Sequence, residues 1–318
     1  MDIHELSIKA AAIKENVEKV IIGKSDTITL IITALVANGH VLLEDVPGTG
    51  KTVMAKSLAK SIQADFKRIQ FTPDLLPSDI TGLNFYNQKL AEFTFRSGPA
   101  FTNILLADEI NRATPRTQSS LLECMEEKQI TIDGETRNLK KPFLVIATQN
   151  PVETAGTFPL PEAQLDRFLM QINIGFPDVN EEIEILNRFI MDNPLESITA
   201  VCSKEDLLLM QECIKSVYIH PTLMKYMIEI VHKTRTHKDL SLGVSPRGSL
   251  ALLRAVQAYS AICGNDYVTP ETVQYLVPYV LSHRLILRNS FQQSDSGLEV
   301  IKGILHDTPV PTEDFQRG

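Results

Sequence analysis

The chain has 318 residues, of which 43% are hydrophobic and 22% charged, and its formal net charge is −8. This composition is typical of a globular protein, and the length favours two domains. The acidic balance counts against a non-specific grip on nucleic acid or on an anionic membrane surface.

The N-terminal segment predicts helices rather than a targeting sequence. Residues 1–20 alternate charged and aliphatic side chains at helical spacing, without the basic and then apolar pattern of a secretory signal peptide. The longest apolar run, ITLIITALVA at 28–37, is too short to cross a bilayer. We therefore expect a core helix there and no membrane insertion.

The four cysteines give no sign of a disulfide or of a zinc site. They show no C-x-x-C spacing and no nearby histidine partner, and they are Cys124, Cys202, Cys213 and Cys263. Buried free thiols are typical of a reducing compartment, so we expect a cytoplasmic protein.

The first half of the chain alternates strand and helix signals. Short apolar runs predict strands at 40–44, 66–71, 103–108, 143–148 and 168–174, and a helix over 51–62 follows the first of them. Continuous aliphatic strands with helices between them indicate a parallel sheet covered on both faces. The predicted fold class is therefore α/β, with an αβα nucleotide-binding domain at 1–177.

Two segments interrupt this alternation, and a different pattern follows it. Residues 81–97 and 129–139 each place strand signals around a polar turn, with Asp133-Gly134 at the second turn. We expect two hairpins that project from the sheet as contact devices. After residue 177 strands become sparse and capped helices dominate, which predicts a second, all-helical domain at 178–318.

The segment LLEDVPGTGKT at 42–52 resembles a phosphate-binding loop, G-x-x-x-x-G-K-[ST], although Asp45 stands at the first glycine position. We expect the Asp45 carboxylate to point away from phosphates that would repel it. Lys51 would reach the β- and γ-phosphates of ATP, and Thr52 would offer its hydroxyl to Mg²⁺. The bland alternative is a glycine-rich turn before a helix. The residues expected around the nucleotide are Pro47, Gly48, Thr49, Gly50, Lys51, Thr52 and Val53.

Two further motifs fall at strand ends, where ligands lie in open α/β sheets. ILLADEIN at 104–111 ends a strand in Asp108, which can hold Mg²⁺ through water, and Glu109, which can polarise a water for attack on the γ-phosphate. ATQNP at 147–151 places Asn150 where it could orient that water. Alone, each motif could be an acidic strand end or an Asn-Pro turn. Three motifs on three strand ends favour one catalytic site.

Two arginines complete the predicted catalytic set. Arg167 lies in PEAQLDRF just before the last strand, and Arg247 lies in GVSPRGS at a helix N-terminus, where its charge opposes the helix dipole. Either could be a solvated surface arginine or part of an ion pair. The functional interpretation is that they act in trans on a γ-phosphate, since arginines supplied in this way neutralise transition-state charge in phosphoryl transfer.

Four stretches taken together are similar to the MoxR family of AAA+ ATPases: EDVPGTGKT, ADEINRATPRTQSSLLECMEEKQITIDGE, ATQNPVETAGTFPLPEAQLDRF and GVSPRGSLALLRAVQA. The likeness runs from about Val20 to His306, and it tolerates Asp45 where most AAA+ chains have glycine. It implies an AAA+ core with an insert hairpin at 81–97, a hairpin before the sensor-1 strand at 129–139, and a helical lid. It also implies these roles: Walker A for Lys51 and Thr52, Walker B for Asp108 and Glu109, sensor 1 for Asn150, arginine finger for Arg167, and sensor 2 for Arg247.

The resemblance further implies ATP and Mg²⁺ as cofactors and a ring of identical subunits, usually a hexamer, in which Arg247 acts in cis or in trans. MoxR-type ATPases are chaperone-like and help to mature client complexes or insert their cofactors, commonly with a partner that carries a von Willebrand factor A domain. The alternative is a nucleic-acid or chelatase-type motor of the same clade. The second hairpin offers it only Arg137, with Lys140 and Lys141 at its base. A non-hydrolysing scaffold would lack one of the catalytic residues, and all are present.

Overall fold

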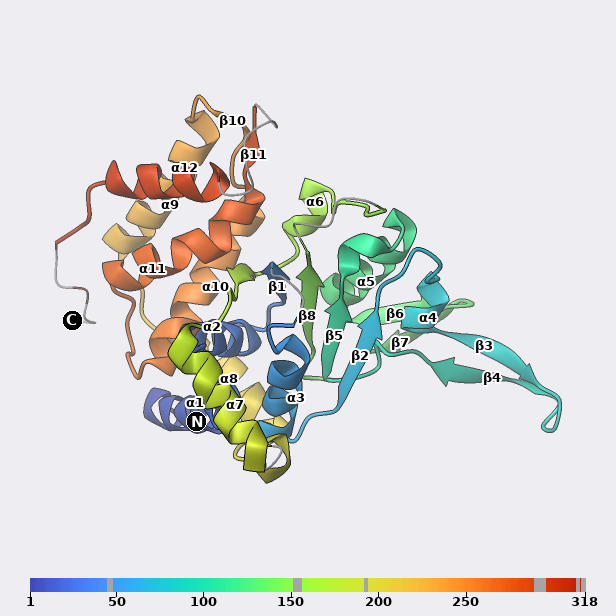
Figure 1. Cartoon of the computed structure of the whole chain (residues 1–318). Coiled ribbons are helices and arrows are strands. Elements are labelled where there is room, and N and C mark those ends of the chain that lie inside the picture. Colours follow the sequence, from blue (N-terminus) through green and yellow to red (C-terminus); the bar gives the residue numbers. More distant parts are fainter. Residues whose placement is uncertain (45–47, 151–155, 192–193, 289–295, 313–314, 316–318) are drawn as a thin grey trace.

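A computed structural model describes residues 1–44, 48–150, 156–191, 194–288, 296–312 and 315 of the chain. Its centre is a five-stranded parallel sheet with the strand order β2-β5-β8-β1-β9 (Figure 1). The strands are β1 (Val41–Glu44), β2 (Phe66–Gln70), β5 (Ile104–Asp108), β8 (Leu144–Gln149) and β9 (Met170–Asn173). All five predicted strands are present, within a residue or two of the predicted limits.

The central strands of the sheet are buried on both faces because they are mainly apolar, whereas the edge strand β2 exposes Lys67 and Arg68. In β1, Val41 and Leu43 face one apolar cluster and Leu42 faces another, and β5 and β8 alternate in the same way. The first cluster is covered by α1 (Ile3–Glu18), α2 (Ser25–Val36) and α3 (Lys51–Ser61), and the second by α5 (Pro115–Glu127). The predicted α/β class with helices on both faces is confirmed.

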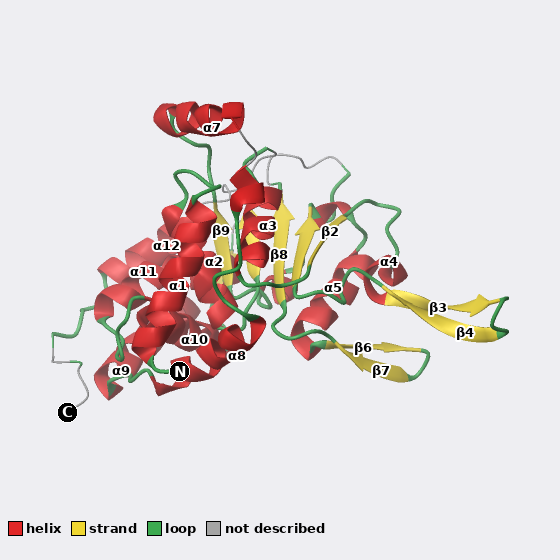
Figure 2. Cartoon of the chain, turned by 90° about the horizontal axis from the view of Figure 1, so that it is seen from below, coloured by secondary structure: helices red, strands yellow, loops and turns green. Residues whose placement is uncertain are grey.

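Two antiparallel hairpins project from the same side of the sheet (Figures 1 and 2). One consists of β3 (Gly82–Asn87) and β4 (Glu92–Ser97) and follows the short helix α4 (Pro77–Thr81). The other consists of β6 (Gln129–Ile132) and β7 (Glu135–Asn138) around Asp133 and Gly134, both at positive φ. The Asn84 amide donates to the Asp133 carboxylate at 2.8 Å and so connects the two hairpins.

The rest of the chain is mainly helical, as the sequence predicts. Its helices are α7 (Val179–Met191), α8 (Lys204–Cys213), α9 (Pro221–Thr236), α10 (Pro246–Ile262), α11 (Pro270–Leu281) and α12 (Ser296–His306). The all-helical expectation misses one small sheet, in which β10 (Leu240–Leu242) pairs with β11 (Ile286–Leu287). The apolar cluster that contains α1 and α2 continues into α10 and α11, so the helical half shares its core with the first half. The boundary between residues 177 and 178 stays a prediction.

Two sequence-based expectations concern single residue types. The cysteines are free thiols, but only Cys124 and Cys202 are buried, whereas Cys213 is half-buried and Cys263 is exposed. Across the described residues, every helix is too short or too polar to traverse a lipid bilayer.

Candidate nucleotide-binding site

The glycine-rich loop leads from β1 into α3. Asp45 and Pro47 lie outside the described residues, and with them the expectation for the Asp45 carboxylate. Gly48 and Gly50 have φ of 91° and 81°, a left-handed conformation that glycine adopts without strain. A Cβ atom would meet nothing within 4 Å at Gly48, so the backbone conformation and not the available space favours glycine there. Gly50 caps α3, whose first N–H groups therefore face the loop.

A cavity of about 300 Å³ opens in front of this loop, at the carboxyl ends of the strands. It brings together the predicted residues of all three motifs: Gly48, Thr49, Gly50, Lys51, Thr52 and Val53 from the loop and α3, Asp108 and Glu109 from the end of β5, and Asn150 from the end of β8. Arg68, Gln70, Thr148 and Gln149 complete its lining. Backbone N–H groups at a helix N-terminus beside a lysine form a site for a polyphosphate.

Asp108 is held from two sides by neighbouring strands. The Arg68 guanidinium on β2 donates to Asp108 Oδ2 at 2.6 Å, and the Thr148 hydroxyl on β8 donates to Oδ1 at 2.7 Å. Both partners are adjacent because β5 lies between β2 and β8, with Gln70 opposite Asp108 in the register. The carboxylate is therefore fixed in direction within the cavity.

Glu109 has an unusual backbone conformation, with φ 55° and ψ 51° in the left-handed region. Such a conformation in a residue other than glycine marks strain that functional sites often retain. Its N–H donates to the Thr148 hydroxyl at 2.8 Å. Its Oε2 accepts from the Gln70 amide at 2.6 Å and lies 3.0 Å from Arg112 Nε. The turn after β5 thereby aims the Glu109 carboxylate into the cavity.

Asn150 follows directly after β8 and is 8% exposed. Its carbonyl oxygen accepts from the Asn111 amide at 3.4 Å, which joins the end of β8 to the turn after β5. Asn150 therefore lines the same cavity as the two acids.

Arg167 and Arg247 are not among the described residues that line this cavity. Both point to Glu126 in the last turn of α5. Arg167 Nε lies 3.3 Å from Glu126 Oε2, and Arg247 Nη2 lies 2.5 Å from Oε1. The structure thus brings the two predicted arginines together, but away from the nucleotide cavity of their own chain.

Sequence reasoning missed three residues that organise the site: Arg68, Gln70 and Thr148. Each touches Asp108 or Glu109, and each is a polar residue on a strand of the central sheet. Their signal in the sequence is weak, because each is a single polar side chain inside a predicted strand, FKRIQF or FLVIAT, and the strand pattern does not indicate its partner.

The donor set of the cavity fits Mg²⁺. Thr52 and Asp108 contribute a hydroxyl and a carboxylate, which are the oxygen ligands that Mg²⁺ prefers. Among the residues that the structure describes, no group of three or more His, Cys, Asp or Glu side chains could hold a metal ion alone. Since Mg²⁺ at phosphate sites takes only one or two protein ligands beside water and phosphate, these two residues suit an ion that enters with the nucleotide.

Residues 40–170 match the family described as "ATPase family associated with various cellular activities (AAA)", and residues 232–304 match the AAA lid domain. The protein YeaC of Bacillus subtilis is 50% identical over 98% of this chain and 97% of its own length. Chaperone MoxR1 of Mycobacterium tuberculosis is 41% identical over 93% and 80%. The crystal structure of a candidate ATPase from Cytophaga hutchinsonii superposes with a TM-score of 0.90 at 39% identity, covering 97% of this chain and 96% of that one.

Proposed function

The chain belongs to the MoxR family of AAA+ ATPases and therefore binds and hydrolyses ATP, and from this premise we propose that it acts as a ring of identical subunits that remodels a client protein. In this proposal each subunit completes the catalytic site of its neighbour. The work of the ring is chaperone-like: maturation of a client complex, or insertion of a metal or cofactor into it.

One observation carries the trans arrangement. The cavity holds the loop, the two acids and Asn150, but the arginines lie elsewhere on the chain, gathered at Glu126. Phosphoryl transfer gains several orders of magnitude from an arginine at the γ-phosphate. The one arginine of the described cavity lining, Arg68, is paired with Asp108, so in this proposal a second copy completes the site by presenting Arg167 and Arg247 to it. Because the arginine pair and the cavity are different surfaces, the proposed contact is head-to-tail, and head-to-tail contacts form a ring when the rotation between subunits closes.

The proposed roles within the cavity follow from the contacts. The N–H groups of residues 48–52 and the Lys51 ammonium bind the phosphates. Thr52 and Asp108 would hold Mg²⁺, which would supply positive charge to the phosphates. Glu109 accepts a proton from the attacking water, and Asn150 orients that water.

Mixing two inactive variants tests the trans arrangement. Lys51→Ala disables a subunit's own cavity but leaves Arg167, whereas Arg167→Ala leaves the cavity but removes the finger. Each variant alone should be inactive. In an equal mixture about a quarter of the interfaces would combine an intact cavity with an intact arginine, so we expect about a quarter of the wild-type turnover.

The control is proof that mixed assemblies form, by co-purification of differently tagged subunits. If mixed assemblies form and no ratio of the two variants restores ATP hydrolysis, the arginine does not act in trans and the proposed ring loses its basis.

The projecting hairpins support a contact with a protein client. Exposed apolar side chains gather on the β3–β4 hairpin: Leu83, Phe85, Tyr86, Leu90 and Phe93. Tyr86 and Phe93 stack edge to face with ring centroids 5.4 Å apart, so the hairpin presents an ordered apolar surface. A partner with a von Willebrand factor A domain and a cytoplasmic location remain predictions from the sequence.

The alternative of a nucleic-acid motor finds less support in these contacts. Arg137 on β7 pairs with Glu135, and its guanidinium lies 4.2 Å from the centroid of the Phe95 ring. Its charge is therefore engaged within the protein, whereas a hairpin that grips phosphates needs basic side chains directed outward.

A further inference from the structure

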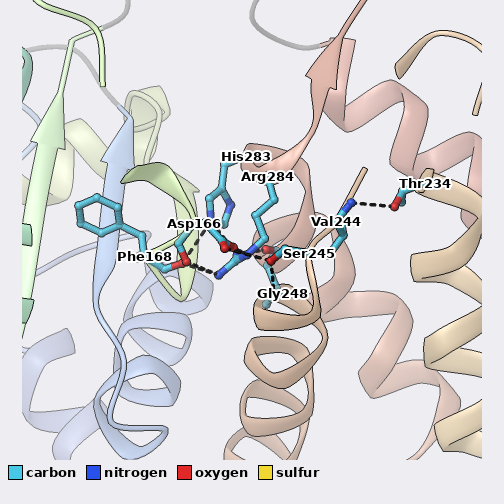
Figure 3. A network of polar contacts seen from close by, with 9 residues as sticks. Asp166, Phe168, Thr234, Val244, Ser245, Gly248, His283 and Arg284 are labelled. Atoms are coloured by element: carbon cyan, nitrogen blue, oxygen red, sulfur yellow. Dashed lines mark hydrogen bonds and ion pairs between the residues drawn. The ribbon is translucent and has the colours of Figure 1, made fainter. Parts of the chain in front are cut away.

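The backbone on both sides of Arg167 is held by one arginine from the helical half of the chain (Figure 3). Arg284 lies in the 3₁₀ turn Ser282–Arg284 after α11, and its side chain is 2% exposed. Its Nε donates to Asp166 Oδ1 at 2.7 Å, and its Nη2 donates to the carbonyl oxygens of Asp166 at 3.2 Å and Phe168 at 2.7 Å. A single planar guanidinium thus fixes residues 166 and 168, with Arg167 between them.

The same carboxylate also binds the helix that carries Arg247. Asp166 Oδ2 accepts from the Ser245 hydroxyl at 3.0 Å, and Ser245 is the N-cap of α10, two residues before Arg247. Asp166 therefore connects the Arg167 loop, the start of α10 and the end of α11. From these two positions Arg167 and Arg247 extend to one carboxylate, that of Glu126.

The remaining donors of Arg284 are also satisfied. Its Nη1 donates to the Val280 carbonyl oxygen and to His283 Nε2, the latter at 2.8 Å. Burial lowers the pKa of Arg284 to about 10, which leaves it charged at neutral pH, and Asp166 opposes that lowering. Burial also holds the pKa of His283 well below its usual value, so its ring is neutral and can accept the bond. These partners hold the Arg284 guanidinium in one orientation, because turning it away would leave a buried N–H group of a charged side chain without a hydrogen bond.

Gly248 in the SPRG motif leaves room for this arginine. A Cβ atom there would lie 2.9 Å from Arg284 Cδ and 2.5 Å from Val244 Cγ1, distances that real Cβ atoms do not tolerate. The Arg284 side chain therefore passes the first turn of α10 only because residue 248 is glycine.

We propose that Arg284, Asp166 and Ser245 are positioning residues that hold Arg167 and Arg247 together as one unit for the neighbouring subunit's nucleotide. This inference rests on the proposed trans arrangement. It adds that any movement of α10 and α11 carries both arginines with it, because Asp166 is bound to both helices' ends. The lid would then set when the neighbour can hydrolyse ATP.

The mixing experiment can separate this role from ordinary stabilisation. Ser245→Ala removes the hydroxyl that binds Asp166. This substitution is added either to the Lys51→Ala variant or to the Arg167→Ala variant before the two are mixed. In the Lys51→Ala subunit, which supplies the arginines, we expect kcat to fall about tenfold, the effect of about 1.4 kcal/mol of lost transition-state stabilisation, with KM for ATP unchanged. When Ser245→Ala is placed in the Arg167→Ala subunit, which supplies only the cavity, we expect kcat to change by no more than about twofold.

Two further variants keep the test decisive if Ser245→Ala weakens the cap of α10. Ser245→Thr retains the hydroxyl and the cap and should restore complementation. Gly248→Ala keeps every polar group, but its Cβ would collide with Val244 and with Arg284, and the displacement of Arg284 should reproduce the asymmetric loss.

Equal losses from either subunit would mean that the network only stabilises the fold, and no loss from either would mean that it does not position the arginines. Both results overturn the inference while leaving the trans arrangement intact. Absence of complementation between the unmodified pair, Lys51→Ala with Arg167→Ala, would instead contradict the proposed function itself.

Discussion

At the scale of single residues, Thr148 is the side chain that connects the two acids of the site. Its hydroxyl donates to Asp108 at 2.7 Å and accepts from the Glu109 N–H at 2.8 Å. The hydroxyl therefore fixes the direction of one carboxylate and supports the strained backbone that carries the other. Neither Ala nor Val could do both, because each lacks the donor and the acceptor.

Replacing Thr148 with Val removes these two hydrogen bonds and almost no volume. A hydrogen bond to a charged group is worth about 1.5–3 kcal/mol, so we expect kcat to fall about ten- to a hundredfold while ATP binding stays within about threefold. Thr148→Ser keeps the hydroxyl and should stay within about threefold of wild type in kcat. Steady-state ATPase assays, with nucleotide affinity measured by fluorescence, check this. Equal kcat for the Val and Ser variants would show that the Thr148 hydroxyl does not contribute to catalysis.

From the sequence alone, a residue of this site can be predicted only where it belongs to a local motif. Asp108 ends β5, Asn150 follows β8, and Lys51 lies after the loop that follows β1. Parallel strands bring such residues to one edge of the sheet. Arg68 and Thr148 are different, since their partners lie on strands adjacent in space but distant along the chain. The spacing of residues along the sequence does not predict contacts between such strands. Glu126, the shared partner of Arg167 and Arg247, could not be predicted either, because it is distant from both arginines along the chain.

At the scale of elements, His40 joins α5 to the middle of the sheet. Its Nδ1 accepts from the Val145 N–H on β8 at 3.0 Å, and its Nε2 donates to the Met125 carbonyl oxygen of α5 at 3.1 Å. These two bonds require the neutral ring. Burial lowers the pKa of His40 to about 4, and the positive charge of Lys128 at the end of α5 acts in the same direction.

This buried ring predicts a pH dependence of folding stability. Because the folded pKa is depressed, the contribution of His40 is complete above about pH 6.5 and is lost as the pH falls towards 4, where the unfolded ring is protonated and the folded ring is not. The shift corresponds to about 3 kcal/mol. His40→Gln can keep both hydrogen bonds without titrating. Between pH 7 and 4, the free energy of unfolding in urea should fall about 3 kcal/mol further for wild type than for this variant.

Other groups that titrate in this range, such as the buried His283, are present in both proteins and cancel in the difference. If the two proteins lose stability in parallel from pH 7 to 4, then His40 is not held neutral by the fold.

The elements themselves were largely predictable, and the exceptions have physical causes. The Asp133-Gly134 turn predicts its hairpin because both residues must take positive φ, as they do. The β10–β11 pair escaped prediction because strands of three and two residues carry no periodicity. The strand order β2-β5-β8-β1-β9 was not predicted either, since it depends on how crossovers pack rather than on any one segment.

At the scale of the whole molecule, the arginine pair at Glu126 is separate from the cavity, and in the proposed trans arrangement one chain presents two halves of different catalytic sites. On this proposal the chain would gain activity only by association, and bound ATP should strengthen the association because the γ-phosphate would attract the neighbour's arginines. Nucleotide that is bound but not hydrolysed should therefore hold the ring together.

Glu109→Gln supplies that state, since an amide can occupy the carboxylate's place without accepting a proton. We expect this variant to bind ATP and to lose about 10²- to 10⁴-fold in turnover. With ATP and Mg²⁺, sedimentation velocity should show the 35.5 kDa chain shifting to a ring-sized species, which ADP should not produce. The matched control, Glu109→Gln with Arg167→Ala, retains the cavity but should assemble more weakly, because the γ-phosphate then has no arginine to attract. A monomer in saturating ATP at every concentration, or equal assembly of the two variants, would show that the nucleotide does not bridge subunits through Arg167.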